Sequence, residues 1–279
     1  MGTLRDRAEQ LKAKRPGYGD ILDYYVEVRK AQAASGASLN IDPIKLKGKW
    51  SDESFSLIRK EDFPVDVEAS ISLFHTLCRI GKTANPHMAE EVEKIENLLS
   101  EDKLDLKDLL GGAGKGQRSK NAADGLGLDK LVLDFLVLSS IRPSIEAGMK
   151  QVGGDLELES WRECHCPVCG SMPSLNLLQG VEGKRYSLCS YCDFQWRIDR
   201  LSCAVCGNGE PKSLSYFSGE GEEAFRIDLC DNCRHYIKTI DYRELEASDA
   251  ALEDLATLHL DVLAVEKGYT RAVPALWGA

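Results

Sequence analysis

The sequence predicts a multidomain α+β protein, with an N-terminal α-helical domain, two tandem four-cysteine modules and a C-terminal helix. Apolar residues recur at helical spacing through the first half of the chain. From Trp161 to Tyr242 apolar and polar residues alternate instead, as in Phe194 to Ile198, which is typical of strands. All four CxxC pairs lie in this second region, and helical spacing returns after it. The expected domains are 1–155, 156–200, 201–243 and 244–279, the last packing back on the helical domain.

The first half contains five segments with a helical pattern. Pro16 and Gly17 stop the first segment, and Gly81 is placed to end the third. Asn85 followed by Pro86 indicates the start of the fourth, because proline fits the first turn of a helix. The fifth is apolar on nearly all sides and is expected in the middle of a bundle, with Pro143 kinking or ending it. The segments are Leu4–Leu11, Asp20–Ala34, Val65–Ile80, Asn85–Leu99 and Leu128–Ile141.

Two stretches of the helical half lack such a pattern. Residues 42–63 are polar and irregular. Residues 111–127 contain six glycines and three basic residues and are expected to form a mobile loop. No GxxxxGK[ST] pattern occurs there and no strand precedes it, which argues against a phosphate-binding loop. After Tyr242, Ser248 is a candidate N-cap for the final helix, whose inward stripe runs from Leu252 to Leu263 and ends near Gly268.

Composition narrows the class of protein. The 279 residues include 35 basic and 45 acidic side chains, giving a net charge of −10. That balance argues against nucleic-acid binding, which needs a basic face. No apolar run is long enough for a signal peptide or a membrane span, so we expect a cytoplasmic protein with no membrane contact. Thiols stay reduced in the cytoplasm, so the ten cysteines call for an explanation other than disulfides.

The cysteines belong to an internal repeat. Cys166-Pro-Val-Cys169-Gly170 returns as Cys203-Ala-Val-Cys206-Gly207, and the two later pairs return with the same internal spacing. The pairs are separated by 19 residues in the first copy and 23 in the second, the spacing of zinc-ribbon and rubredoxin-type sites. The predicted metal ligands are Cys166, Cys169, Cys189 and Cys192 in the first copy, and Cys203, Cys206, Cys230 and Cys233 in the second.

The residue types suit closed, structural metal sites. Two cysteines three apart on a tight turn can direct both sulfurs at one ion, and four thiolates leave no open position. The residue after each pair tends toward left-handed geometry, which suits Gly170 and Gly207, is tolerable for Asp193 and is less usual for Arg234. Each repeat is too small to fold on a core alone, so metal binding is expected to contribute to its folding.

Several alternatives stay open. A CxxC pair can be a redox-active dithiol, and ligands could be exchanged between the repeats, although each repeat carries a complete set. The rubredoxin-like turn at Cys166 favours iron, and zinc is possible. Cys164 and His165 are either a spare thiol and an alternative ligand or an ordinary loop, and Cys78 is expected in the core. The other histidines, at 75, 87, 235 and 259, show no catalytic or metal spacing, and no catalytic motif is apparent.

At these residues the sequence resembles the FdhE family, the accessory proteins of bacterial formate dehydrogenases. The resemblance is carried by Cys166-Pro-Val-Cys169-Gly170-Ser171-Met172-Pro173, by the three later CxxC pairs in order, by Tyr236-Ile237-Lys238, and by Asp254-Leu255-Ala256-Thr257-Leu258 with Glu266-Lys267-Gly268-Tyr269. It extends over nearly the whole chain and is weak from about Ile41 to Gly127. Near the start, Arg5-Asp6-Arg7-Ala8, Pro16 and Ala31-Gln32-Ala33 are similar but less specific.

The resemblance implies a non-enzymatic, cytoplasmic maturation factor that binds the catalytic subunit of formate dehydrogenase. It also implies a helical domain joined to two rubredoxin-like modules related by a pseudo-twofold, two metal ions with iron as the family's metal, and no nucleic-acid or membrane partner. A second hypothesis is a redox-active iron protein that transfers electrons or senses oxidation during assembly of the client enzyme. A nucleic-acid-binding ribbon is disfavoured, because residues 161–243 hold 10 basic and 11 acidic side chains.

Overall fold

The computed structural model describes residues 3–44, 56–115, 117–152, 161–245 and 248–274. The chain divides into two compact units, which are described separately. Among the described residues, the first unit takes 3–44 and 59–152, and the second takes 56–58 and everything from 161 onward. The expected boundary near residue 155, and residues 45–55 of the polar stretch 42–63, lie outside the described residues.

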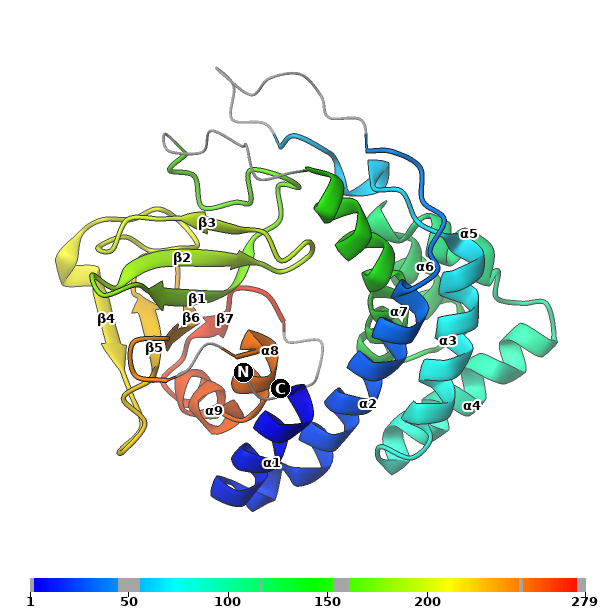
Figure 1. Cartoon of the computed structure of the whole chain (residues 1–279), viewed down its shortest axis with the longest axis horizontal. Helices are drawn as coiled ribbons and strands as arrows, with labels where there is room; N and C mark the ends of the chain where they lie inside the picture. The colour runs from blue at the N-terminus through cyan, green and yellow to red at the C-terminus, as the bar shows by residue number, and fades with distance from the viewer. Residues whose placement is uncertain (1–2, 45–55, 116, 153–160, 246–247, 275–279) are drawn as a thin grey trace. The chain divides into compact units, whose positions relative to one another are not determined.

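The first unit is helical (Figure 1). The long helix α7 packs against α2, α3, α5 and α6, while α1 packs on α2 and α4 on α3. None of the helices in the described ranges is both long and apolar enough to cross a membrane. The helices are α1 (Leu4–Lys14), α2 (Gly19–Gly36), α3 (Val67–Gly81), α4 (Pro86–Ser100), α5 (Leu106–Gly111), α6 (Gln117–Leu126) and α7 (Lys130–Val152), with short 3-10 turns at Pro16–Tyr18, Lys60–Asp62 and Ala113–Lys115.

Side-chain caps explain where several of these helices begin. Asp66 accepts a hydrogen bond from the Ala69 N–H at the start of α3. Asn85 accepts one from the Met88 N–H at the start of α4, with Pro86 in the first turn. Both arrangements satisfy backbone donors that have no partner inside the helix. The predicted start at Asn85 and Pro86 is therefore confirmed.

Pro143 lies inside α7 and does not end it, so the helix extends eleven residues beyond the predicted end at Ile141. A proline has no N–H, so the carbonyl four residues earlier loses its helical partner. That carbonyl belongs to Ser139, and it accepts a 2.8 Å hydrogen bond from the buried Gln32 Nε2 on α2. A side chain from a neighbouring helix thus replaces the missing bond, which the local sequence could not reveal.

The prediction of a mobile loop over residues 111–127 was wrong. Apart from residue 116, which is outside the described ranges, this stretch contains a 3-10 turn and the ten-residue helix α6. Ala123 of α6 is buried, and the helix packs on α7. Tertiary packing overrides the weak helix propensity of a polar, glycine-containing segment.

The second unit is built on one sheet (Figure 1). Its described strands are β1 (Pro173–Gln179), β2 (Lys184–Cys189), β3 (Gln195–Arg197), β4 (Leu214–Phe217), β5 (Phe225–Cys230), β6 (His235–Asp241) and β7 (Thr270–Arg271), with a 3-10 turn at Pro211–Ser213 before β4. The strand order is β3-β2-β1-β6-β5-β4, and β7 pairs with β6. The pairs β1–β6 and β6–β7 are parallel, and the other neighbouring pairs, including β5–β6, are antiparallel.

This order and direction contradict the expected pseudo-twofold between the modules. The first module contributes β1 to β3 and the second β4 to β6, and each appears in the sheet in the same order, last strand to first. Because β1 and β6 are parallel, the strands of both modules also run in the same directions. A twofold axis would reverse either the order or the direction. The modules are therefore repeated head to tail, with the first strand of one joined to the last strand of the other.

One face of the sheet is apolar and is covered by the helices α8 (Ala250–Leu255) and α9 (Leu258–Glu266). Leu175, Ile227 and Ile240 are buried in this core together with Leu260 of α9. Asp249, and not the predicted Ser248, caps α8, and a break at Thr257 divides the expected single helix. The break turns part of the predicted inward stripe outward, so Val262 and Leu263 are exposed.

Candidate metal centres

The cysteines lie on four turns at the ends of strands. In each module the first CxxC pair precedes the first strand, and the second pair lies on the turn between the last two strands. The first turn of each module has the same hydrogen bond: the N–H after the second cysteine donates to the carbonyl of the first, at 2.8 Å from Gly170 to Cys166 and 3.0 Å from Gly207 to Cys203. Such turns hold two cysteine side chains on the same side of the backbone.

The residue after each pair has left-handed geometry in all four turns, at glycine or aspartate in three of them and at arginine in the fourth. The φ values are +73° for Gly170, +72° for Gly207, +56° for Asp193 and +58° for Arg234. Glycine takes this conformation without strain, whereas arginine takes it at some cost. The predicted turn geometry is therefore confirmed at all four positions, including the unfavourable one.

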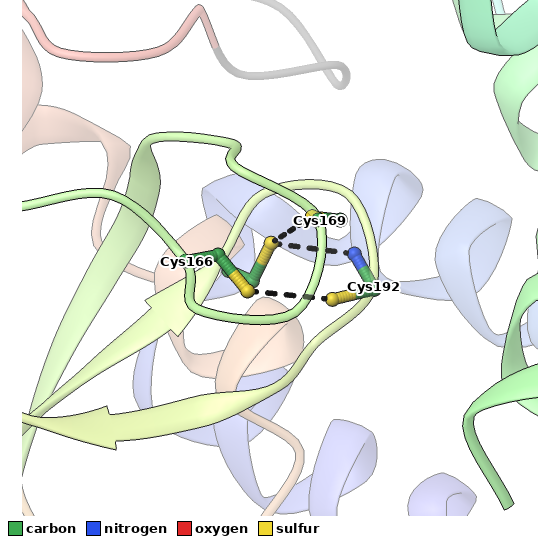
Figure 2. Close-up of side chains that lie close together, drawn as sticks. Cys166, Cys169 and Cys192 are labelled. Carbon is green, nitrogen blue, oxygen red and sulfur yellow. Dashed lines mark hydrogen bonds between the residues drawn. The ribbon is translucent and has the colours of Figure 1, made fainter. Parts of the chain in front are cut away.

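Within each module the four sulfur atoms gather around one point. The members of each set lie within 4.8 Å of one another. In the first set the Sγ–Sγ distance is 3.7 Å for Cys166–Cys192 and 3.3 Å for Cys169–Cys189. Figure 2 shows Cys166, Cys169 and Cys192 with their side chains directed at one another.

The second set has the same arrangement. Cys203 and Cys233 are 3.8 Å apart at sulfur, as are Cys206 and Cys230. A disulfide needs about 2.05 Å, so none of these pairs is bonded. All ten cysteines are free. In both modules the sulfurs that approach one another come from the same repeat, as the complete set of cysteines in each repeat suggested.

These distances suit a tetrahedral ion. Four sulfurs at about 2.3 Å from a metal lie about 3.8 Å from each other, close to three of the four Sγ–Sγ distances given above. Backbone N–H groups also point at sulfur, at 3.4 Å from Cys192 to the Cys189 Sγ and from Val205 to the Cys203 Sγ. Such donors stabilise thiolates and orient them for an ion. Each set could hold a metal ion, and four-sulfur sites of this kind accept zinc or iron.

The two sets differ in exposure. All four cysteines of the first set are buried, whereas in the second Cys206 is exposed and Cys233 is half-buried. Burial raises the pKa of the Cys166 thiol far above its usual range, because a charge is costly there without a compensating cation. Burial also acts on Cys206, but hydrogen bonds from the Asn208 backbone and the Asn232 side chain outweigh it and lower the pKa to about 7.

A segment from before the first module lies against the first set. The N–H groups of Leu57 and Ile58 donate to the carbonyls of Pro167 and Val168 at 3.0 and 2.9 Å, between the first two cysteines. Both apolar side chains are almost completely buried. We call residues 56–58 the strap. The strap lies within residues 42–63, which the sequence analysis described only as polar and irregular. The two adjacent apolar residues were the only sequence feature that could have indicated a buried segment there.

The remaining candidates are not brought together into a site. Cys78 is buried in α3, as predicted. The Cys164 Sγ lies 3.6 Å from the Cys203 carbonyl oxygen, and the His165 ring packs edge-on against Trp161. His87 and His259 each pair with a carboxylate, and His235 hydrogen bonds to the Cys233 carbonyl. Among the described residues, only the two four-cysteine sets gather three or more ligand groups around one point.

Sequence reasoning missed a buried charge network behind the second module. Lys238 of β6 is completely buried and bonds to Asp254 at 2.7 Å and Asp261 at 2.6 Å. Arg271 of β7 bonds to the same two carboxylates at 2.7 and 3.1 Å. The sequence feature that could have indicated this network was a lysine within a predicted strand of mostly apolar residues. The network balances two positive and two negative charges, and it fastens α8, α9 and β7 to the centre of the sheet.

Comparison with known proteins gives two family matches in the second half of the chain. The family model described as "FdhE, central domain" matches residues 165–200, and that described as "FdhE, C-terminal domain" matches residues 201–277. The first of these contains the first four-cysteine set, and the second contains the other set together with the buried charge network.

Three sequence relatives extend the comparison. The chain is similar to a protein FdhE homolog of Aquifex aeolicus, with 29% identity over 95% of this chain and 91% of that protein. An FdhE homolog of Edwardsiella ictaluri is 39% identical over 44% of this chain. FdhE of Escherichia coli O127:H6 is 37% identical over 39% of this chain. The last two alignments span only 40% and 35% of those relatives.

A solved structure agrees with the fold. The crystal structure of the FdhE protein from Pseudomonas aeruginosa matches with a TM-score of 0.70 over 98% of this chain and 93% of that one. The sequences are 22% identical in this comparison, so the match speaks to the fold. The α+β architecture predicted from the sequence, helical first and β-rich with two four-cysteine sets second, is confirmed.

Proposed function

The chain belongs to the FdhE family, and from this membership we propose that it is a non-catalytic accessory protein of formate dehydrogenase. In this proposal it acts in the cytoplasm, where it binds the catalytic subunit of the enzyme during maturation. The observation that carries the proposal is the pair of preformed four-sulfur sets within one sheet. A closed shell of four cysteines leaves no position for a substrate, which is the character of a structural site.

Each module would hold one ion through its own four cysteines, with iron favoured and zinc as the alternative. A bound ion would supply positive charge to the buried thiolates and would tie two turns of each module together. The protein's own residues supply the rest: the left-handed turns place the sulfurs, and the backbone N–H groups orient them. The expected content is two ions per chain, measurable by mass spectrometry of the metals.

The partner surface would be that of a protein and not of a nucleic acid. The chain has a net charge of −10, and thiolate-bound ions would add negative charge to the second unit. We expect no salt-dependent binding to DNA or RNA. A specific complex with the catalytic subunit would bury on the order of 1,200–2,000 Å². For such an interface we expect that a pull-down retains the catalytic subunit when the salt concentration is raised.

The test pairs metal content with partner binding. The full chain is compared with Cys189→Ser, in the first four-cysteine set, and Cys164→Ser, a matched change outside both sets. Wild type and Cys164→Ser should retain two ions and capture the formate dehydrogenase catalytic subunit. Cys189→Ser should lose one ion and much of the capture. Failure of the wild-type protein to associate with either the immature or the mature catalytic subunit would contradict the proposal.

A second function is favoured by the exposure of the second set. An iron ion beside the exposed Cys206 could exchange an electron with a partner, whereas the first set is buried. In this hypothesis the chain transfers electrons or senses oxidation during assembly. Iron-loaded protein with a serine at Cys169 would isolate the second set. Reversible bleaching of its visible absorption by a mild reductant would favour the redox role, and a colourless zinc protein would exclude it.

A further inference from the structure

A cavity of about 270 Å³ lies in the second unit where the β1–β2 turn, the end of β3 and the segment joining the two modules meet. It is separate from the four-cysteine sets, none of whose residues line it. Its charged lining holds five cations and two carboxylates, in a protein whose overall charge is −10. The cations are Arg162, Lys184, Arg185, Arg197 and Arg200, and the carboxylates are Glu182 and Asp199.

The most deeply buried of these cations is fixed in place by the fold. Arg185 is only 3% exposed. Its Nη1 donates to the Ser202 carbonyl at 2.7 Å, and its Nη2 bonds to Asp228 at 3.1 Å. Asp228 does not fully neutralise the charge of Arg185, because the same carboxylate also pairs with Arg226 at 2.9 Å. Because its Nη atoms already donate to backbone carbonyls and to Asp228, Arg185 contributes a fixed positive charge to the lining and leaves direct contact with an anion to the other cations.

The cations nearer the opening are more available. The Arg197 side chain has no ion pair or hydrogen bond to any other described residue, and it is exposed. Arg200 donates from Nη1 to the Glu182 carbonyl at 3.3 Å, which holds it beside the β1–β2 turn. These two exposed guanidinium groups add to the buried positive charge of Arg185 in the cavity lining.

The two carboxylates compensate this charge only in part. Glu182 lies 3.3 Å from Lys184, and Asp199 lies 3.8 Å from Arg162, with the two carboxylate side chains 77% and 72% exposed. Exposed pairs of this kind contribute about 0–1 kcal/mol, so an incoming dianion can displace them. Five positive and two negative side chains leave an excess of three positive charges at the cavity.

We propose that this cavity binds a phosphate group, either as the free ion or as the phosphate ester of a larger molecule. Guanidinium groups bind phosphate oxygens in pairs, and four of the five cations are arginines. The volume lies below the roughly 300–1,000 Å³ that drug-sized ligands occupy, which fits a phosphate group and not a whole dinucleotide. The inference rests on the geometry of this cavity and is independent of the proposed accessory function.

The test measures binding of inorganic phosphate to the metal-loaded full chain by calorimetry, at constant ionic strength set with chloride. The double variant R197Q/R200Q removes two of the cavity's cations. The matched control R5Q/R7Q removes the same two charges from α1 in the helical unit. We expect phosphate binding to wild type and control, and binding at least about tenfold weaker in R197Q/R200Q, since a charged hydrogen bond contributes enough for such a factor.

Three outcomes would overturn the inference: no heat with phosphate, equal binding in R197Q/R200Q, or the same response to chloride alone. Equal binding in that variant would place the phosphate at another site of the metal-loaded chain. Thermal unfolding without phosphate should match between the variants and wild type, because Arg197 and Arg200 are exposed. A single K184Q variant provides an independent reduction of the charge. Tighter binding of glycerol phosphate than of inorganic phosphate would identify an ester as the ligand, and the reverse would identify the free ion.

Discussion

The buried charge network in the second unit makes a strong prediction about stability. Asp261 is 1% exposed and lies 2.6 Å from Lys238, which is completely buried. Asp261 also accepts a 3.0 Å hydrogen bond from the Tyr236 hydroxyl and pairs with Arg271 at 3.1 Å. Asp261→Asn keeps the shape of the side chain but leaves two buried cations facing a single remaining carboxylate. Breaking a buried pair in this way costs about 3–5 kcal/mol.

That loss is a large fraction of the 5–15 kcal/mol that typically stabilises a domain. It corresponds to a fall in Tm of roughly 10–20 °C for a unit of this size. Urea unfolding followed by tryptophan fluorescence reports on the unit directly, because Trp161 and Trp196 are both buried in it. The metal must be held at a fixed, saturating concentration, since ion binding itself raises apparent stability.

Two further variants make the prediction specific to burial. Asp23→Asn breaks a 2.8 Å pair with Lys12, but Asp23 is 57% exposed, so we expect a cost of at most about 1 kcal/mol. Adding Lys238→Met to Asp261→Asn restores the balance of buried charge. The double variant should therefore cost about 2–3 kcal/mol less than the sum of the single variants. A cost for Asp261→Asn equal to that of Asp23→Asn, or simple additivity, would refute the reasoning.

Four other outcomes follow from the structure. Burial raises the pKa of Glu146, but the pairing with Arg29 at 2.9 Å outweighs it and holds this pKa below its ordinary value of 4.5. Because the folded-state pKa is lowered, the stabilisation of the fold by ionised Glu146 is present above pH 4.5 and is lost as the pH falls below it. Acid unfolding of wild type should therefore be steeper than that of Glu146→Gln. Gly114→Ala should be destabilising, because the added Cβ would overlap a backbone carbonyl oxygen of the Lys60–Asp62 turn. Gly125→Ala, in open space within α6, should instead stabilise by about 0.5–1 kcal/mol. Equal effects of the two variants on Tm would contradict this prediction. Ile58→Ala should cost about 2–5 kcal/mol and speed metal loss from the first four-cysteine set. In a chelator time course on wild type the exposed second set should release its ion first, and simultaneous release would show that exposure does not control the rate.

The two four-cysteine sets could be predicted from sequence because their signal is local. Each CxxC turn places two sulfurs within four residues, and the duplicated pattern assigns one complete set to each module. The left-handed residue after each pair follows from the turn, so even Arg234 adopts it. The start of α4 was predictable for the same reason, since Asn85 and Pro86 act within one turn of the helix.

Features that depend on distant partners were not predictable in this way. Pro143 continues its helix only because Gln32, on another helix, bonds to the freed carbonyl. The segment now seen as α6 forms because α7 offers it a surface. The parallel pairing of β1 with β6, and the burial of Lys238 beneath α8 and α9, join residues more than fifteen positions apart. A local sequence pattern does not indicate which of several compatible partners a segment will pack against.

The head-to-tail repeat bears on how the two candidate metal sites cooperate. Strand β6 carries a turn of the second set at its start, and it pairs with β1, whose preceding turn carries cysteines of the first set. The same strand also pairs with β5 and β7 and holds Lys238 of the buried network. Losing the ion from either module would therefore weaken a strand that the other module needs, because sheet stability resides in cross-strand contacts. Two ions bound in one sheet would together stabilise a single surface, which fits a protein whose proposed task is to present that surface to a partner.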